Sequence, residues 1–208
     1  MKRRFVIAIS FTLVLFALLL IPLDGKVDNT FLFFLGRFHP IILHLPIGAL
    51  MVLLLMEIIN KFRPKLNLDA ACKILLWFSV LSIIPTITLG FLLASSGSYD
   101  DELLNFHKWL GWFTALICVW LVVIRQKTLI QSNSGQSRFY YFFLSINVAL
   151  LSLAGHYGGY LTHGEDYLTK YMPLAMKNFL NIDNVKDQYL AINTEIDSAS
   201  EEALYFKN

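Results

Sequence analysis

Five long apolar segments, separated by short polar stretches, constrain this chain more than any other feature. They cover about residues 5–23, 38–60, 71–94, 107–124 and 139–157. A helix needs about 20 apolar residues to cross the hydrocarbon core of a bilayer, and each segment comes close to or exceeds that length. Only 15% of the residues are charged, whereas a soluble domain has about 25%. The sequence therefore predicts an all-α, polytopic membrane helical bundle of about five transmembrane helices.

The first apolar segment follows a basic N-terminus, a pattern shared by cleaved signal peptides and uncleaved membrane anchors. Its apolar run is long and no small-residue cleavage site follows it, which favours the uncleaved anchor. We therefore expect a signal-anchor helix over residues 1–24 and a four-helix membrane module over residues 30–165. Residues 166–208 are polar and mixed, and we expect a partly helical tail there.

The basic residues near the ends of the apolar segments set the expected orientation, because short cytoplasmic loops are rich in Lys and Arg. With the N-terminus inside and five crossings, ten of the 17 basic residues and only two of the 15 acidic ones lie inside. The prediction is a bacterial inner-membrane protein with a cytoplasmic N-terminus and a periplasmic tail. The inside basic residues are Lys2, Arg3, Arg4, Lys61, Arg63, Lys65, Lys73, Arg125, Lys127 and Arg138.

Several chemistries find no support in the sequence. There is no CxxCH, CxxC or Cys/His zinc spacing, so we expect Cys72 and Cys118 to be small buried apolar residues. There is also no nucleophile with a base, no phosphate-binding loop and no feature that predicts a nucleic-acid partner. Glu57 is expected to reach towards the inner surface, and residues 95–102 form a solvated acidic loop rather than a cation site.

All five histidines fall at the predicted outer ends of the segments. Because a helix rises about 1.5 Å per residue, His44 and His156 are expected to share one layer inside the bundle. His39, His107 and His163 are expected to form a second layer at the surface. In this reading Pro40 fits the first turn of a helix and Pro46 produces a kink.

Two histidines at matching depth on facing helices form the usual axial pair of a b-type haem. A histidine within a membrane also needs a partner for each ring nitrogen. The sequence therefore predicts haem iron bound by His44 and His156, with Arg37 and Lys108 near the haem propionates. Glycines beside these residues (Gly111, Gly155, Gly158 and Gly159) would let a flat macrocycle approach the backbone. The plainer alternative is that each imidazole bonds to a loop carbonyl or to water.

Two stretches carry a resemblance to a known group. They are residues 36–48, GRFHPIILHLPIG, and residues 155–168, GHYGGYLTHGEDYL. Over about residues 30–172 the chain resembles the membrane module, of unassigned function, at the N-terminus of planctomycete-type c-type cytochrome proteins of Bacteroidota and Planctomycetes. The resemblance implies a membrane module beside a periplasmic electron-transfer domain, and a haem-binding or redox role for the five histidines. This chain departs from that pattern because it has no CxxCH.

Three functions remain open at this level. The first is a b-type-haem electron-transfer module with a bis-histidine site near the periplasmic face, working with a periplasmic c-type cytochrome or with quinol. The second is a non-catalytic anchor for other membrane or periplasmic subunits, docked through the acidic tail residues Glu195, Asp197, Glu201 and Glu202. The third is a metal-ion site or transporter that uses the outer histidines, although no acidic residue lies inside the last three segments. Whether the chain is an enzyme stays open.

Overall fold

The computed structural model describes residues 2–20, 30–97, 99–131, 134–164, 167 and 169–181, with the side chains of residues 2 and 126–137 left out. The described part is all-α, as predicted, and contains no strand. It divides into a helical unit, residues 1–162, and a C-terminal unit that begins at His163. The acidic tail residues proposed for docking lie outside the described residues.

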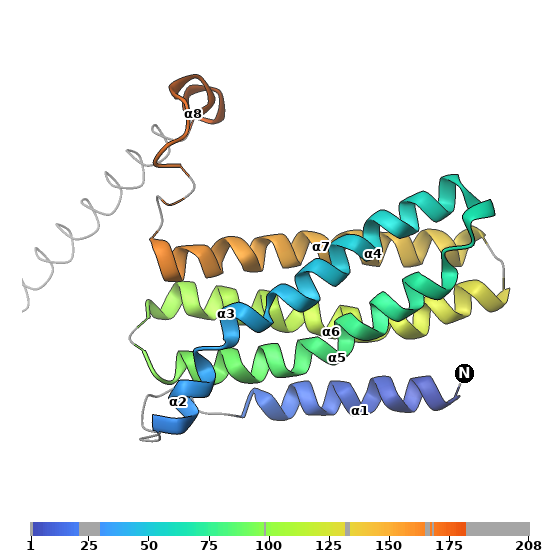
Figure 1. Cartoon of the computed structure of the whole chain (residues 1–208), viewed down its shortest axis with the longest axis horizontal. Helices are drawn as coiled ribbons and strands as arrows, with labels where there is room; N and C mark the ends of the chain where they lie inside the picture. Colours follow the sequence, from blue (N-terminus) through green and yellow to red (C-terminus); the bar gives the residue numbers. More distant parts are fainter. Residues whose placement is uncertain are drawn as a thin grey trace, which may run out of the picture. The chain divides into compact units, whose positions relative to one another are not determined.

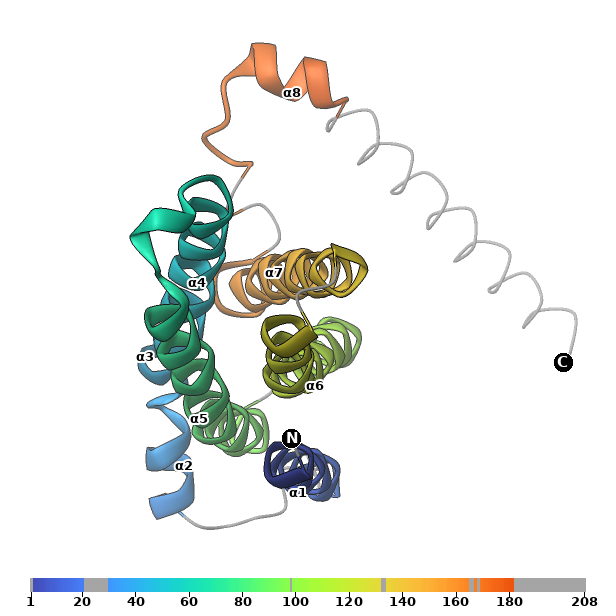
Figure 2. The same cartoon turned by 90° about the vertical axis from the view of Figure 1, so that its right-hand side faces the viewer.

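The N-terminal helix α1 (Lys2–Leu18) lies beside helix α6 (Asp101–Gln131) and also contacts α5 (Asp69–Ala94) (Figures 1 and 2). The indole Nε1 of Trp112 on α6 donates to the Leu15 carbonyl over 3.1 Å. Edge-to-face aromatic pairs join Phe16 to Trp112 and Phe5 to Trp120. Since Phe5 meets Trp120 and Phe16 meets Trp112, α1 runs antiparallel to α6 through most of the depth of the bundle.

Residues 30–62 form three helices: α2 (Thr30–Gly36), α3 (His39–Ile42) and α4 (His44–Phe62). The second apolar segment, expected as one helix over about residues 38–60, is thus divided between α3 and α4. The two prolines explain both breaks, because proline has no N–H to donate to the carbonyl four residues earlier. Pro40 leaves the Gly36 carbonyl without its helical donor, and α2 ends there. Pro46 does the same to Ile42, where α3 ends. The break places His39 and His44 at the starts of two different helices.

The other long helices are α5 (Asp69–Ala94), α6 (Asp101–Gln131) and α7 (Ser134–His163), and the 3₁₀ turn η1 (Pro64–Leu66) lies between α4 and α5. The expected loop over residues 95–102 is wrong at its end, because Asp101 and Glu102 form the first turn of α6. The Asp100 carboxylate accepts from the Leu103 N–H over 2.8 Å and so caps the helix.

Four helical stretches are long and apolar enough to cross a membrane: Thr30–Phe62, Asp69–Ala94, Asp101–Arg125 and Arg138–His163. They are four candidate membrane spans, and they fall within the part of the chain where the four-helix membrane module was expected. Helix α1, with 17 residues, reaches the lower end of the usual transmembrane length. A fifth crossing by α1, and with it the N-in, C-out orientation, stays a prediction.

The bundle interior is mostly aliphatic, with Leu50, Leu53, Leu76, Leu121 and Leu144 almost completely buried. Cys72 and Cys118 are free and fully buried among them, as expected. In the C-terminal unit, Pro173 precedes helix α8 (Leu174–Leu180), which confirms a partly helical tail.

Candidate functional site

His39 opens α3 and turns its ring towards α5. Its Nδ1 lies 2.9 Å from the Thr86 carbonyl oxygen. A Cβ on Gly90 would lie only 3.0 Å from Cε1 of this ring. A side chain larger than hydrogen at position 90 would therefore displace the imidazole.

His107 occupies an equivalent place between α6 and α7. Its Nδ1 lies 2.8 Å from the Ala154 carbonyl oxygen. A Cβ on Gly158 would lie 2.9 Å from Cε1 of His107 and 3.2 Å from its Nδ1. We expected Gly158, near His156, to let a flat macrocycle approach the backbone, but the ring that lies against this glycine is the imidazole of His107.

The two histidines thus share one local design. Each ring lies against a glycine, and each Nδ1 bonds to the carbonyl four residues before that glycine. A carbonyl oxygen has two lone pairs, so it accepts from the histidine as well as from the N–H of its own helix. Because the carbonyl only accepts, Nδ1 must carry the proton. In the neutral ring, Nε2 then holds a lone pair for a further partner.

The rings of His39 and His107 meet at the same end of the bundle. Their centroids are 6.3 Å apart and their planes are nearly perpendicular, at 88°. Both side chains are half-buried. No described residue hydrogen-bonds to Nε2 of either ring. Neither Nε2 atom is completely buried. Both Nε2 atoms therefore keep some accessible surface.

The structure places the remaining predicted site residues differently. His44 is exposed, and its Nδ1 forms a hydrogen bond with the Pro40 carbonyl, four residues earlier in the chain. His156 lies against Tyr160 of its own helix, with ring centroids 4.3 Å apart. In the described part of the chain, His44 and His156 form no hydrogen bond or ring contact with each other. Arg37 is exposed.

The predicted surface layer is brought together only in part. It grouped His39, His107 and His163, and the first two do meet. His163 is exposed at the end of α7 and stacks on Tyr167, with centroids 4.3 Å apart. Lys108, expected near a propionate, lies with Nζ 5.5 Å from the Trp109 ring centroid.

A second polar contact lies deeper, between α6 and α7. Asn147 donates from Nδ2 to the Thr114 carbonyl over 2.8 Å, and it is fully buried. Thr114 follows His107 by seven residues and Asn147 precedes Ala154 by seven, the register of two antiparallel helices. Asn147 Oδ1 is buried without a hydrogen-bond partner among the described residues.

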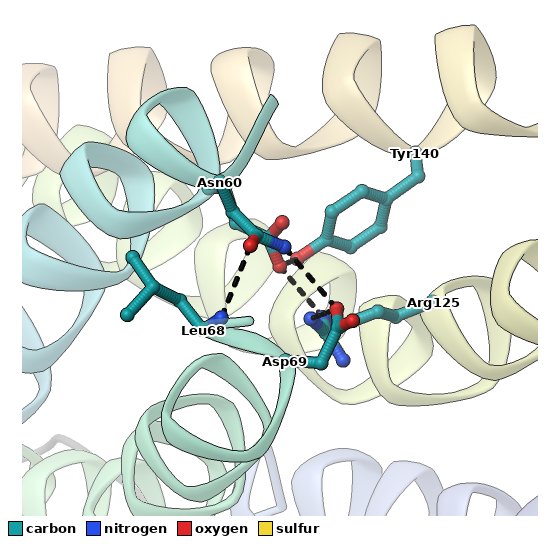
Figure 3. A network of polar contacts seen from close by, with 6 residues as sticks. Asn60, Leu68, Asp69, Arg125 and Tyr140 are labelled. Atoms are coloured by element: carbon teal, nitrogen blue, oxygen red, sulfur yellow. Dashed lines mark hydrogen bonds and ion pairs between the residues drawn. The ribbon is translucent and has the colours of Figure 1, made fainter. Parts of the chain in front are cut away.

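A charged network closes the opposite end of the bundle (Figure 3). Arg125 donates from Nε to Glu57 Oε1 over 2.6 Å and from Nη2 to Asp69 Oδ1 over 3.0 Å. The Tyr140 hydroxyl donates to the same Glu57 oxygen over 2.9 Å. Asn60 donates from Nδ2 to Asp69 over 3.3 Å. Helices α4, α5, α6 and α7 are thereby joined at one point.

This network corrects the expectation for Glu57. The side chain does not reach towards the surface, since Glu57 is only 3% exposed and Arg125 only 5%. A carboxylate in an apolar helix requires a partner when buried, and Arg125 at the end of another apolar segment was the available signal. The sequence shows that the two opposite charges are present, but it does not show that the two side chains are in contact.

Residues 37–166 match the model of a family described as a predicted membrane protein, DUF2231. The match covers more than half of the chain and includes all five histidines. The chain belongs to the DUF2231 family. No curated protein and no solved structure matches it. The family description confirms a membrane protein, while the predicted association with c-type cytochrome proteins stays a prediction.

Proposed function

We propose that this chain is an integral membrane electron-transfer module that binds b-type haem through His39 and His107. The observation that carries the proposal is the pair of imidazoles from two helices, each held by Nδ1 and each with Nε2 available. Histidines that bind a metal commonly donate their other N–H to a carbonyl, which fixes the ring and its tautomer. Thr86 and Ala154 supply such carbonyls.

The distance between the two rings suits one metal ion between them. A metal ion lies about 2 Å from a coordinating imidazole nitrogen, and so about 3 Å from the ring centroid. Two imidazoles on opposite sides of one ion therefore have centroids about 6 Å apart. The centroids of His39 and His107 are 6.3 Å apart.

The number of ligands favours haem iron over a free metal ion. A structural zinc site takes four protein ligands, whereas a haem iron takes one or two because the macrocycle supplies the other four. Among the described residues there is no group of three or more His, Cys, Asp or Glu side chains that could hold a metal ion. Two histidines alone are complete as axial ligands and incomplete as a zinc site.

Glycines lie on the helices around the pair. Gly90 and Gly158 lie against the two rings, and Gly111 lies one turn from His107 on α6. Gly111 precedes the fully buried Cys118 by seven residues, so it is on the inward side of its helix. A Cβ at Gly111 would meet nothing within 4 Å. Haem held by His107 would therefore meet no side chain at position 111.

The site lies at one end of the bundle, which the charge distribution predicts to be periplasmic. Bound haem would supply a one-electron redox couple. His39 and His107 would hold the iron, while Thr86 and Ala154 keep their rings in place. A redox site at one face does not span the bilayer, so we propose exchange with a periplasmic c-type cytochrome or with quinol at that face.

The test is a reduced-minus-oxidised visible spectrum of the protein purified in mild detergent, with haem supplied during expression. The proposal predicts the sharp reduced bands of b-type haem, confirmed by a pyridine haemochrome assay. His39→Ala and His107→Ala should each abolish these bands. His44→Ala and His156→Ala are the matched controls, and both should keep them.

Two results would overturn the proposal. A well-folded protein without haem, despite supplied haem, would remove the electron-transfer role and leave the membrane anchor as the better reading. Loss of haem in the control variants, with haem retained in His39→Ala and His107→Ala, would return the ligands to His44 and His156.

A further inference from the structure

The segment beyond the last membrane span exposes many large apolar side chains. Tyr171 and Phe179 are each 86% exposed, and Leu174, Met176 and Leu180 are each at least half exposed. Single exposed apolar residues are common on proteins, but a concentration of them in a short segment marks an interaction surface.

Helix α8 arranges part of this apolar surface on one side. Met176, Phe179 and Leu180 follow the i, i+3, i+4 spacing that brings side chains onto one helix face. Lys177 and Asn178 lie towards the other side at 100° per residue. The helix begins after Pro173 and ends at Asn181, whose left-handed φ of 54° stops it.

The segment is also basic and aromatic. Residues 169–181 contain Lys170 and Lys177 and no acidic residue. The ammonium of Lys170 lies 5.4 Å from the ring centroid of Tyr171. Tyrosine is enriched at the interface between membrane and water, and lysines on an amphipathic helix attract anionic lipid headgroups. Apolar, aromatic and basic side chains together match the chemistry of that interface.

The chain connection keeps this segment close to a membrane. The last candidate span ends at His163, and α8 starts eleven residues later, at Leu174. At no more than about 3.6 Å per residue, the connection extends at most about 40 Å. A tether of this length gives a high effective concentration of lipid surface, so even a weak intrinsic affinity suffices.

We propose that residues 169–181 form an interfacial anchor that lies in the headgroup region of the membrane that the chain itself spans. Met176, Phe179 and Leu180 enter the boundary of the acyl chains. Lys170 and Lys177 face anionic phosphates, and Tyr171 lies at headgroup depth. The anchor is independent of haem and works on whichever side of the membrane the tail is found.

The test places an environment-sensitive fluorophore on each side of α8 in the full chain. In a Cys72→Ala, Cys118→Ala background, Phe179→Cys and Asn178→Cys are each labelled with a nitrobenzoxadiazole dye. The protein is reconstituted at one copy per nanodisc, in phosphatidylcholine with phosphatidylglycerol. We expect blue-shifted emission, quenched by doxyl-labelled lipid, at position 179 and water-like emission at position 178.

A water-like, unquenched signal at position 179 would overturn the anchor. A blue shift that occurs only with several copies per vesicle, without quenching by doxyl lipid, would overturn it in favour of contact with a second copy. The charge contribution has its own test. In Lys170→Gln with Lys177→Gln, the additional quenching caused by phosphatidylglycerol over pure phosphatidylcholine should disappear, and its persistence would contradict the proposed lysine contacts.

Discussion

Arg125 and Glu57 form an ion pair of 2.6 Å across 68 positions of sequence, inside a bundle whose surroundings are apolar. Both side chains are nearly inaccessible to solvent. Asp69 adds a second carboxylate to the same guanidinium, at 3.0 Å and with its side chain half-exposed. The positive charge of Arg125 is thus balanced by Glu57 in the buried part of the network, while Asp69 is in contact with water.

Removing one partner of this pair should destabilise the protein strongly. Arg125→Met leaves the buried Glu57 carboxylate without its cation, and an uncompensated buried charge costs about 3–5 kcal/mol. The measurement is the free energy of unfolding in detergent, from circular dichroism during titration with sodium dodecyl sulfate. Arg63→Met removes an exposed arginine near the same end and is the control.

The double variant, Glu57→Met with Arg125→Met, sharpens this prediction. It removes both charges, so it should recover most of the loss seen in the single variant. The remaining deficit should reflect the Tyr140 hydroxyl, which then lacks its acceptor. Equal stability of Arg125→Met and Arg63→Met would show that the pair contributes nothing.

The buried amide of Asn147 leads to a prediction of the opposite sign. Its Nδ2 donates to the Thr114 carbonyl, but its Oδ1 has no partner among the described residues. An interhelical hydrogen bond in a membrane contributes about 0.6 kcal/mol, and an unsatisfied buried acceptor costs about 1–3 kcal/mol. Asn147→Leu should therefore unfold at the same or a higher detergent fraction than the unchanged protein. A loss above about 2 kcal/mol would mean that Oδ1 has a partner, such as a buried water.

Much of the membrane module was predictable, because length and apolar composition decide which helices cross a bilayer. The ends of the helices were less so. The polar residues Asp101 and Glu102 were expected in a loop, yet they belong to α6 because Asp100 caps the helix nearly two turns before the apolar run begins. Capping depends on local side chains that an apolar-run criterion ignores.

The histidine pair was predictable by depth and not by direction. Depth follows from counting residues along a helix, and it put His39 and His107 in one expected layer together with His163; the rings of His39 and His107 do lie near each other. Direction depends on rotation about the helix axis, at 100° per residue. His44 follows His39 by five residues, which turns it about 140° away even along an unbroken helix. This spacing indicates that His39 and His44 do not face the same site. Which helices lie next to each other could be learned only from the structure.

Close backbone approach gives a third prediction, at Gly36. A Cβ there would lie 2.6 Å from the Leu93 backbone nitrogen, so α2 and α5 touch backbone to backbone. Small residues permit such approach between membrane helices. Gly36→Ala should force the helices apart and cost about 1–3 kcal/mol or more. Gly48→Ala is the control, since its Cβ meets nothing within 4 Å; there alanine should be neutral or stabilising by up to about 1 kcal/mol. Equal unfolding of the two variants would contradict this contact.

Gly158 gives the last prediction, which separates the histidine site from the rest of the bundle. Gly158→Ala places a methyl group 2.9 Å from Cε1 of His107, so the ring must move and lose its bond to the Ala154 carbonyl. Unlike Gly36, the atom in contact belongs to a side chain that can rotate, so the loss of stability should stay within about 1–3 kcal/mol. If His107 is a haem ligand, haem content should fall far more than stability does. Gly155→Ala, one turn away and with nothing within 4 Å of its Cβ, should retain both. Unchanged haem content and stability in Gly158→Ala would mean that the position of the His107 ring does not depend on this glycine.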